Sequence, residues 1–277
     1  NHSFSTRLTL ERELRNGLAQ SELRVFYQPL VSLQDGHISG VEALVRWQHP
    51  DRGLLQPADF LPVAEETGLI TQIDEYVQKQ AFADLSLWRR QGLGDVRVSV
   101  NLSSGQLEQD VFIDRFVGAL KSSGSLPDAV NLEITENTLM QDMEVIIPKL
   151  QELRRLGIRI AIDDFGTGYS SLSYLQQFPI QTLKIDRSFV GDIREDQSDA
   201  SIINAIVAMA RGLKLDLIAE GVENRTQLRY LHAQGCSEGQ GYIFSRAVPA
   251  DEIQVMLREK PFEALIRRES FESVDAV

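Results

Sequence analysis

The chain has 277 residues, 43% of them hydrophobic and 25% charged, which is the composition of a globular protein long enough to bury a large core. Its formal net charge of −12, without any run of Lys or Arg, argues against binding to a DNA or RNA polymer. No apolar run approaches the roughly 20 residues of a membrane-spanning helix. A single cysteine, Cys236, and four scattered histidines argue against a disulfide and against a Cys/His zinc site.

Residues 1–22 are expected to form an N-terminal linker that carries a short helix, predicted over Thr9–Ala19, with Leu10, Leu14 and Leu18 on one face. This helix could pack on the fold that follows or continue a linker from a preceding domain. No leader pattern precedes it, so we expect a cytoplasmic location, which the lone cysteine fits. Because the first residue is not Met, we expect a longer chain, whose other segments could include a sensor domain or a membrane anchor.

Short apolar runs rich in β-branched residues alternate with amphipathic stretches through the rest of the chain. Such runs are typical of strands that are covered on both faces. Eight strands are predicted, over Leu23–Gln28, Ile38–Leu44, Val96–Asn101, Val130–Glu136, Ile158–Asp163, Thr182–Asp186, Asp216–Glu220 and Gly241–Phe244. The main helices are predicted over Leu69–Arg90, Val111–Lys121, Met143–Leu156, Ala200–Arg211 and Thr226–Gln234, and a last one opens at Pro249.

This alternation predicts an α/β fold with a parallel sheet, and eight strands in a chain of this length predict a TIM-like (β/α)8 barrel over residues 23–260. One connection departs from the pattern. Only Val31–His37 separates the first two strands, and its Asp35-Gly36 pair is a hairpin signal. A parallel crossover needs a dozen or more residues, so the first strand should be antiparallel. Residues 261–277 are expected to be a charged tail.

Acidic, amide and Lys side chains follow or end most of the predicted strands. They are Glu42, Asn101, Glu133, Glu136, Asp163, Asp164, Lys184, Asp186, Glu220, Glu223 and Gln240. Any one of them is ordinarily a helix cap, a solvated loop residue or an ion-pair partner. Barrel enzymes, however, place their active sites at the carboxyl ends of the strands, and the joint occurrence predicts such a site.

A group of carboxylates at one barrel mouth requires counter-charge, because close like charges otherwise force some of them to protonate. Oxygen ligands without His or Cys favour Mg²⁺ or Mn²⁺. Adjacent Asp163 and Asp164 could hold two ions, an arrangement that suits phosphodiester cleavage. The glycine-rich segment Asp163–Ser171 is neither a dinucleotide fingerprint nor a Walker loop, and we interpret it as a mobile flap.

The sequence resembles the EAL domain family in a series of motifs that runs from Leu23 to Glu259. These are Tyr27-Gln28-Pro29, Glu42-Ala43-Leu44, Asn101-Leu102-Ser103, Glu133-Ile134-Thr135-Glu136, DDFGTGYSSLSYL from Asp163, Leu183-Lys184-Ile185-Asp186, Glu220-Gly221-Val222-Glu223 and Gln240-Gly241-Tyr242. The resemblance implies a TIM-like barrel with a reversed first strand and metal-dependent hydrolysis of cyclic di-GMP to linear pGpG. One departure is Phe244-Ser245-Arg246-Ala247, where the family often has FSRP.

The resemblance also implies residue roles. Glu42, Asn101, Glu133 and Asp163 would hold one divalent cation, Mg²⁺ or Mn²⁺, and Asp163, Asp164 and Glu220 would hold a second. Lys184 would position or activate the attacking water, and with Glu42 and Glu220 it forms the expected catalytic set. Arg46, Gln28, Leu44, Asp186 and Gln240 would bind the substrate, while Glu136 and Glu223 would support the loop and the metal shell.

Two other functions stay open at this point. Some family members are catalytically silent receptors for the nucleotide, which intact ligand positions argue against. An unrelated Mg²⁺-dependent barrel enzyme that forms an enolate could use Lys184 as its base. The resemblance further implies a homodimer, formed near the glycine-rich segment, and an upstream GGDEF or sensor domain.

Overall fold

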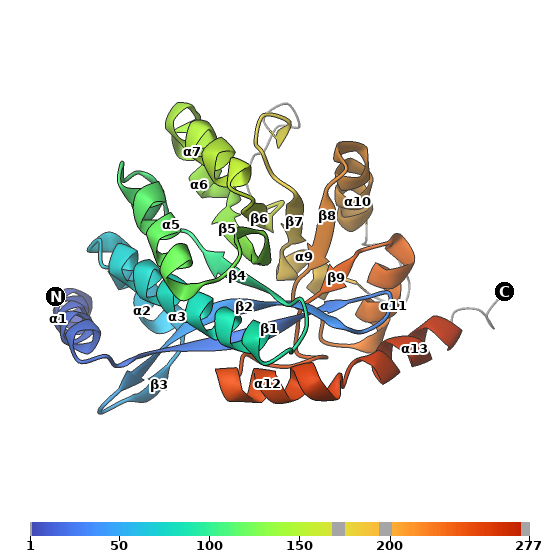
Figure 1. The fold of residues 1–277 in the computed structure, drawn as a ribbon, viewed down its shortest axis with the longest axis horizontal. Helices are drawn as coiled ribbons and strands as arrows, with labels where there is room; N and C mark the ends of the chain where they lie inside the picture. The colour runs from blue at the N-terminus through green and yellow to red at the C-terminus, as the bar shows by residue number, and fades with distance from the viewer. Residues whose placement is uncertain (1, 168–174, 194–200, 273–277) are drawn as a thin grey trace.

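Strand β1 runs against both of its neighbours in an otherwise parallel barrel of eight strands. The computed structural model describes residues 2–167, 175–193 and 201–272 (Figure 1). Its strands are β1 (Leu23–Ser32), β2 (Ile38–His49), β3 (Gly53–Leu55), β4 (Arg97–Asn101), β5 (Val130–Thr135), β6 (Arg159–Phe165), β7 (Thr182–Ile185), β8 (Asp216–Ala219) and β9 (Glu238–Gly239).

Helices surround the barrel and cover its outer face. They are α1 (His2–Ala19), α2 (Pro57–Glu66), α3 (Ile70–Arg90), α4 (Ser104–Leu107), α5 (Phe112–Ser123), η1 (Pro127–Ala129), α6 (Glu136–Gln141), α7 (Met143–Arg155), α9 (Arg187–Gly191), α10 (Ser201–Leu213), α11 (Arg225–Gln234), α12 (Ala250–Glu259) and α13 (Glu263–Glu272). Within the described part of the chain, none combines the length and apolar character that a membrane crossing requires.

The hydrogen-bond pattern closes the barrel and confirms the predicted topology. Strand β1 is antiparallel to β2 and to β9, while β2, β4, β5, β6, β7, β8 and β9 follow one another in parallel. The short turn at Gly36, with φ +80°, makes the β1–β2 hairpin. All the parallel strands therefore present their carboxyl ends at one mouth of the barrel.

Packing in the wall of the barrel follows the predicted pattern of apolar runs. Strand β5 is buried from Val130 to Ile134, and β7 is buried throughout. The helices bury one face each, as in α3, where Ile73, Val77 and Ala81 lie at intervals of four residues. These two layers form the core and leave the polar strand ends at the mouth.

The N-terminal helix packs on the barrel. Leu14 of α1 is fully buried, and Glu13 pairs with Arg52 at 2.8 Å and with His49 at 3.4 Å. Figure 1 shows α1 and α13 on opposite sides of the molecule. Helix α1 is longer than the predicted segment, since it begins at His2.

The predicted eighth strand, Gly241–Phe244, is wrong. The last strand is β9, Glu238–Gly239, and the following residues form a turn. The physical reason is that the backbone at Gly241 packs against Val222 instead of pairing with a neighbouring strand. The approach is so close that a Cβ at Gly241 would lie 2.2 Å from the Val222 carbonyl oxygen. Gln240 therefore follows the strand instead of opening it.

Within the predicted charged tail of residues 261–277, residues 263–272 form helix α13, which was not predicted. Ile266 is buried on its inner face, as is Phe262 just before the helix, and Glu269 continues that face one turn further on. Glu269 is 5% exposed and pairs with Arg225 at 3.3 Å and Arg229 at 3.6 Å on α11. Because a charged residue, Glu269, occupies a buried helical position, the sequence here lacks the regular spacing of apolar residues that predicts a helix. Residues 273–277 lie outside the described part.

Candidate active site

Lys184 stands at the centre of the barrel mouth, fully buried on β7. Its ammonium nitrogen lies 2.5 Å from Glu133 Oε2, 2.7 Å from Glu220 Oε1, 3.1 Å from Asp163 Oδ1 and 3.6 Å from Glu42 Oε2. These four carboxylates come from or directly after four different strands, β2, β5, β6 and β8. One cation is therefore shared among acids that are far apart in sequence.

A chain of amides extends this cluster to β1. Gln240 Nε2 donates to Glu42 Oε2 at 2.7 Å and to Gln28 Oε1 at 2.9 Å, and Asn101 Nδ2 donates to Glu42 Oε1 at 3.0 Å. Gln28 lies directly opposite Glu42 in the antiparallel register. The reversed strand thus brings an amide to the acidic cluster, where it orients Glu42 through Gln240.

Burial and mutual charge displace the pKa values of the cluster. Burial alone would lower the pKa of Lys184, but Asp163, Glu133 and Glu220 raise it well above its usual range. Burial raises the pKa of Glu220 to about 8, although Lys184 opposes the shift, and burial raises that of Glu133 as well. Glu42 shows the reverse: against the effect of burial, Lys184, Gln240 and Asn101 lower its pKa.

A strained turn directs two adjacent carboxylates into the mouth. Asp164 has a φ of +52°, in the left-handed region that few residues other than glycine adopt, and Gly166 follows at +98°. The turn is held by Thr167, whose hydroxyl donates to the Asp164 carbonyl at 2.8 Å. Burial, and then the charges of Asp163 and Asp186, raise the pKa of Asp164 to about 6.

The residues present fit divalent cations. Two groups have ligand oxygens within 4.8 Å of one another: Glu42, Glu133 and Asp163, and Asp163, Asp164 and Glu220. Among the described residues, Glu133 Oε1 is buried without a hydrogen-bond donor. An uncompensated buried carboxylate oxygen is costly, and a hard cation would satisfy it.

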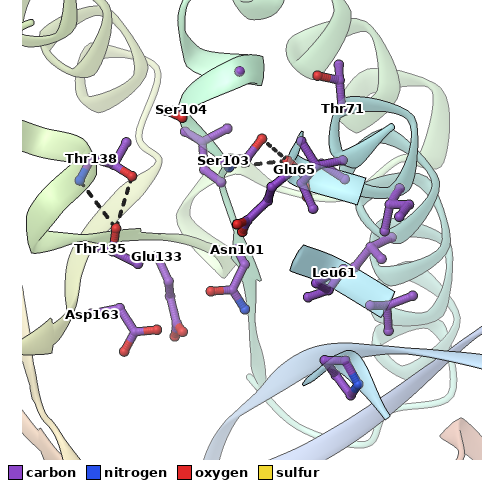
Figure 2. Close-up of a pocket in the computed structure, with 18 of the residues that line it drawn as sticks. Leu61, Glu65, Thr71, Asn101, Ser103, Ser104, Glu133, Thr135, Thr138 and Asp163 are labelled. Carbon is purple, nitrogen blue, oxygen red and sulfur yellow. Dashed lines mark hydrogen bonds between the residues drawn. The ribbon is translucent and has the colours of Figure 1, made fainter. Parts of the chain in front are cut away.

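Two pockets meet at the acidic cluster and share Glu42, Leu44, Pro57 and Asp163. One, of about 600 Å³, extends between α2, α3 and β4 (Figure 2), where Asn101, Glu133 and Asp163 point into a common space that Leu61, Glu65 and Thr71 border on the other side. The second, of about 670 Å³, lies over β7, β8 and β9 and is lined by Gln28, Asp164, Asp186, Arg187, Glu220, Glu223, Gln240 and Tyr242, among others.

The other predicted site residues take different places. Asp186 caps α9 by accepting from the Ser188 amide at 2.9 Å. Glu136 accepts from the Gly166 amide at 3.1 Å and so contacts the base of the glycine-rich segment, whose residues 168–174 lie outside the described part. Arg46 is buried next to the site, donates to the Val45 carbonyl and lines neither pocket.

Comparison with known proteins identifies the family. The sequence model of the EAL domain matches residues 11–247. The chain belongs to the EAL domain family. This confirms the resemblance found in the sequence motifs.

Relatives of this EAL domain include proteins with named activities. The cyclic di-GMP phosphodiesterase NbdA of Pseudomonas aeruginosa is 43% identical over 257 residues, which are 93% of this chain and 33% of NbdA. MucR of the same organism, named a bifunctional diguanylate cyclase/cyclic di-GMP phosphodiesterase, is 42% identical over 92% of this chain and 37% of its own length. The chain thus spans about a third of the length of these curated relatives.

Solved structures share the fold. A structure described as the PaMucR phosphodiesterase in complex with c-di-GMP is 43% identical, with a TM-score of 0.85, over 88% of this chain and 99% of that chain. The EAL enzyme Bd1971 in its cAMP-bound form is 33% identical, with a TM-score of 0.86, over 92% of this chain and 71% of that chain.

Sequence reasoning missed several residues that line the pockets of this EAL domain. Pro57 and Leu61 belong to α2, which was not predicted although Gln56-Pro57 at its start is a usual helix opening. Asp74 lies inside α3 and was not predicted as a pocket residue, because in the sequence it is one polar residue among others in an amphipathic helix. Tyr242 was part of a quoted motif but received no role.

Proposed function

We propose that this EAL domain hydrolyses cyclic di-GMP to linear pGpG with the help of two divalent cations, Mg²⁺ or Mn²⁺. The observation that carries the proposal is the cluster around Lys184, in which four carboxylates and two amides converge at the carboxyl ends of the barrel strands. The names of NbdA and of the PaMucR complex support the same substrate.

The proposed ligand sets follow the two acidic groups. Glu42, Asn101, Glu133 and Asp163 would hold one cation, and Asp163, Asp164 and Glu220 the other, with Asp163 common to both. When bound, such ions supply polarisation of the phosphate and a water of lowered pKa. Glu223, which lines the pocket beside Glu220, would support this shell.

The chain's own residues would orient the reaction. Lys184, within ion-pair distance of Glu220 and Asp163, would hold the attacking water between them and stabilise negative charge there. Gln240 fixes Glu42 from the side of β1. Glu136 holds the base of the glycine-rich segment and hence the position of Asp163 and Asp164.

The shape of the site fits a substrate with two halves. Cyclic di-GMP has two phosphates and two guanosine units, and the two pockets diverge from the same acidic cluster. A phosphate at the cluster would leave one nucleoside on the α2–α3 side, against Leu44, and the other toward Asp186 and Gln28. Arg46, on the same face of β2 as Glu42 and Leu44, would supply positive charge near a phosphate.

Assembly and location belong to the same proposal. We infer that the longer protein carries an upstream GGDEF or sensor domain, which the length and the bifunctional name of MucR support. We also propose a homodimer. A cytoplasmic location is supported by Cys236, the one cysteine, which remains a buried free thiol.

The test is hydrolysis of cyclic di-GMP by the purified chain with Mg²⁺ or Mn²⁺, with separation of pGpG from the substrate. Glu42→Ala and a chelator should each abolish product, whereas Glu252→Ala on the exposed side of α12 should not. Tight binding of cyclic di-GMP without product would favour the silent receptor instead. An enolate-forming enzyme is excluded if cyclic di-GMP binds at the metal site.

A further inference from the structure

Tyr242 is an exposed aromatic side chain on the wall of the larger pocket. Its exposed fraction is 56%, the largest among the exposed large hydrophobic residues of the described chain. The guanidinium carbon of Arg246 lies 4.1 Å from the centroid of its ring, so a cation covers one side of the ring. No role for either residue follows from the acidic cluster.

The backbone fixes this ring in place. Val222 donates its amide to the Gln240 carbonyl at 3.0 Å and accepts from the Ile243 amide at 3.0 Å. Between these two bonds, Gly241 approaches Val222 so closely that a Cβ would lie 2.2 Å from its carbonyl oxygen. Tyr242 therefore projects from a rigid turn that also carries Gln240, two residues away and bonded to Glu42.

The turn is also linked to the reversed strand. Gln28 Nε2 donates to the Ser245 carbonyl at 3.0 Å, one residue before Arg246. Arg246 stacks on Tyr242, and Arg187 lines the same pocket, so two guanidinium groups lie on this side of a site that is otherwise acidic.

We propose that Tyr242, backed by Arg246, is a stacking platform for one guanine base of cyclic di-GMP, on the side of the pocket away from α2. The inference rests on the proposed function and adds a base-recognition residue to it. A planar base can stack on the uncovered side of the ring, and the nearby guanidinium groups favour the electron-rich purine and its phosphate.

The experiment compares Tyr242→Leu, Tyr242→Phe and Tyr242→Trp with the unaltered chain. Leu fills space without a π-face, whereas Phe and Trp keep one. Leu126→Ala is the matched control, because Leu126 is 54% exposed and lines neither pocket. The dissociation constant of cyclic di-GMP is measured by calorimetry in a chelating buffer, and KM and kcat are measured with Mn²⁺.

The platform predicts that Tyr242→Leu raises both the dissociation constant and KM by about 5- to 100-fold, with kcat changed much less. Tyr242→Phe and Tyr242→Trp should stay within about threefold of the unaltered chain, since they keep an aromatic face. Unchanged affinity in Tyr242→Leu, or an equal loss in Leu and Phe, would overturn the inference.

The two proposals fail separately in this design. If the unaltered chain binds cyclic di-GMP but forms no pGpG, the proposed function fails, and the dissociation constants still decide the platform. If the chain hydrolyses cyclic di-GMP and Tyr242→Leu behaves like Leu126→Ala, the function stands and the platform is wrong. Absence of binding to the unaltered chain overturns both.

Discussion

The ammonium nitrogen of Lys184 lies 2.5 Å from Glu133 Oε2, and neither side chain has any exposed surface. Glu42, Asp163 and Glu220 also surround this nitrogen. Lys184 therefore supplies the positive charge that offsets the repulsion among these four carboxylates. Removing one partner of a buried ion pair typically costs 3–5 kcal/mol, because the other charge is left uncompensated.

Lys184→Met should accordingly destabilise the metal-free protein by about 3–5 kcal/mol, measured by urea unfolding. Hydrolysis of cyclic di-GMP should fall by about 100-fold or more, since positioned proton-transfer groups contribute on that order. Lys121→Met, at an exposed position in the last turn of α5, is the control and should change neither quantity appreciably. Full stability in Lys184→Met would contradict the central role of this ion pair.

Divalent cations should stabilise the folded chain through Glu133. Its Oε1 is buried and without a hydrogen-bond donor in the described part of the molecule. We expect Mg²⁺ or Mn²⁺ to raise Tm in proportion to the logarithm of concentration above the dissociation constant. Glu133→Gln should require at least about tenfold more metal for the same increase. Glu75→Gln, whose carboxylate pairs with Arg115 outside the site, should match the unaltered chain.

Asp74 should give the stability a pH dependence. Burial raises its pKa from 3.8 to about 7, although the Ser103 hydroxyl and amide donate to it. The folded state therefore binds a proton between these pH values that the unfolded state has released. The contribution to stability is present below about pH 4 and is lost as pH rises through 7, by roughly 4 kcal/mol at most.

Asp74→Asn, which resembles the protonated acid, should remove this part of the pH dependence and should be more stable than the unaltered chain at pH 8. The measurement is the free energy of unfolding in urea from pH 4 to 8. Asp114→Asn, at an exposed position on α5, serves as the control. An identical pH slope in Asp74→Asn and the unaltered chain would show that Asp74 is ionised throughout.

The sequence was sufficient for the barrel and its acidic mouth because both depend on local patterns. Each parallel strand is an apolar run, and a polar residue at or near its carboxyl end lies at the mouth in any closed parallel barrel, as Asn101 and Asp163 do. The reversal of β1 followed from the length of one connection, which the hairpin at Gly36 confirms.

Tertiary contacts decided what the sequence missed. Gly241 ends β9 early because its backbone packs on Val222, a residue in another loop. Glu269 occupies a buried helical position only because Arg225 and Arg229 face it from α11. Local periodicity in the sequence predicts neither of these long-range contacts. The pocket residues of α2 were missed because the helix itself was not predicted.

Gly17→Ala tests how tightly α1 is joined to the site. In a solvent-exposed helix this change stabilises by about 0.5–1 kcal/mol, and Gly118→Ala in α5, where a Cβ meets nothing within 4 Å, should do so. At Gly17 a Cβ would lie 2.7 Å from Trp47 Nε1 and 2.8 Å from Glu22 Oε2, which are hydrogen-bonded to each other. We therefore expect Gly17→Ala to destabilise by about 1–3 kcal/mol in urea unfolding. Trp47 packs edge-on against Phe60 of α2, and α2 lines one of the two pockets, so KM for cyclic di-GMP should rise as well. If Gly17→Ala instead stabilises the chain as much as Gly118→Ala does, α1 does not pack tightly on the barrel.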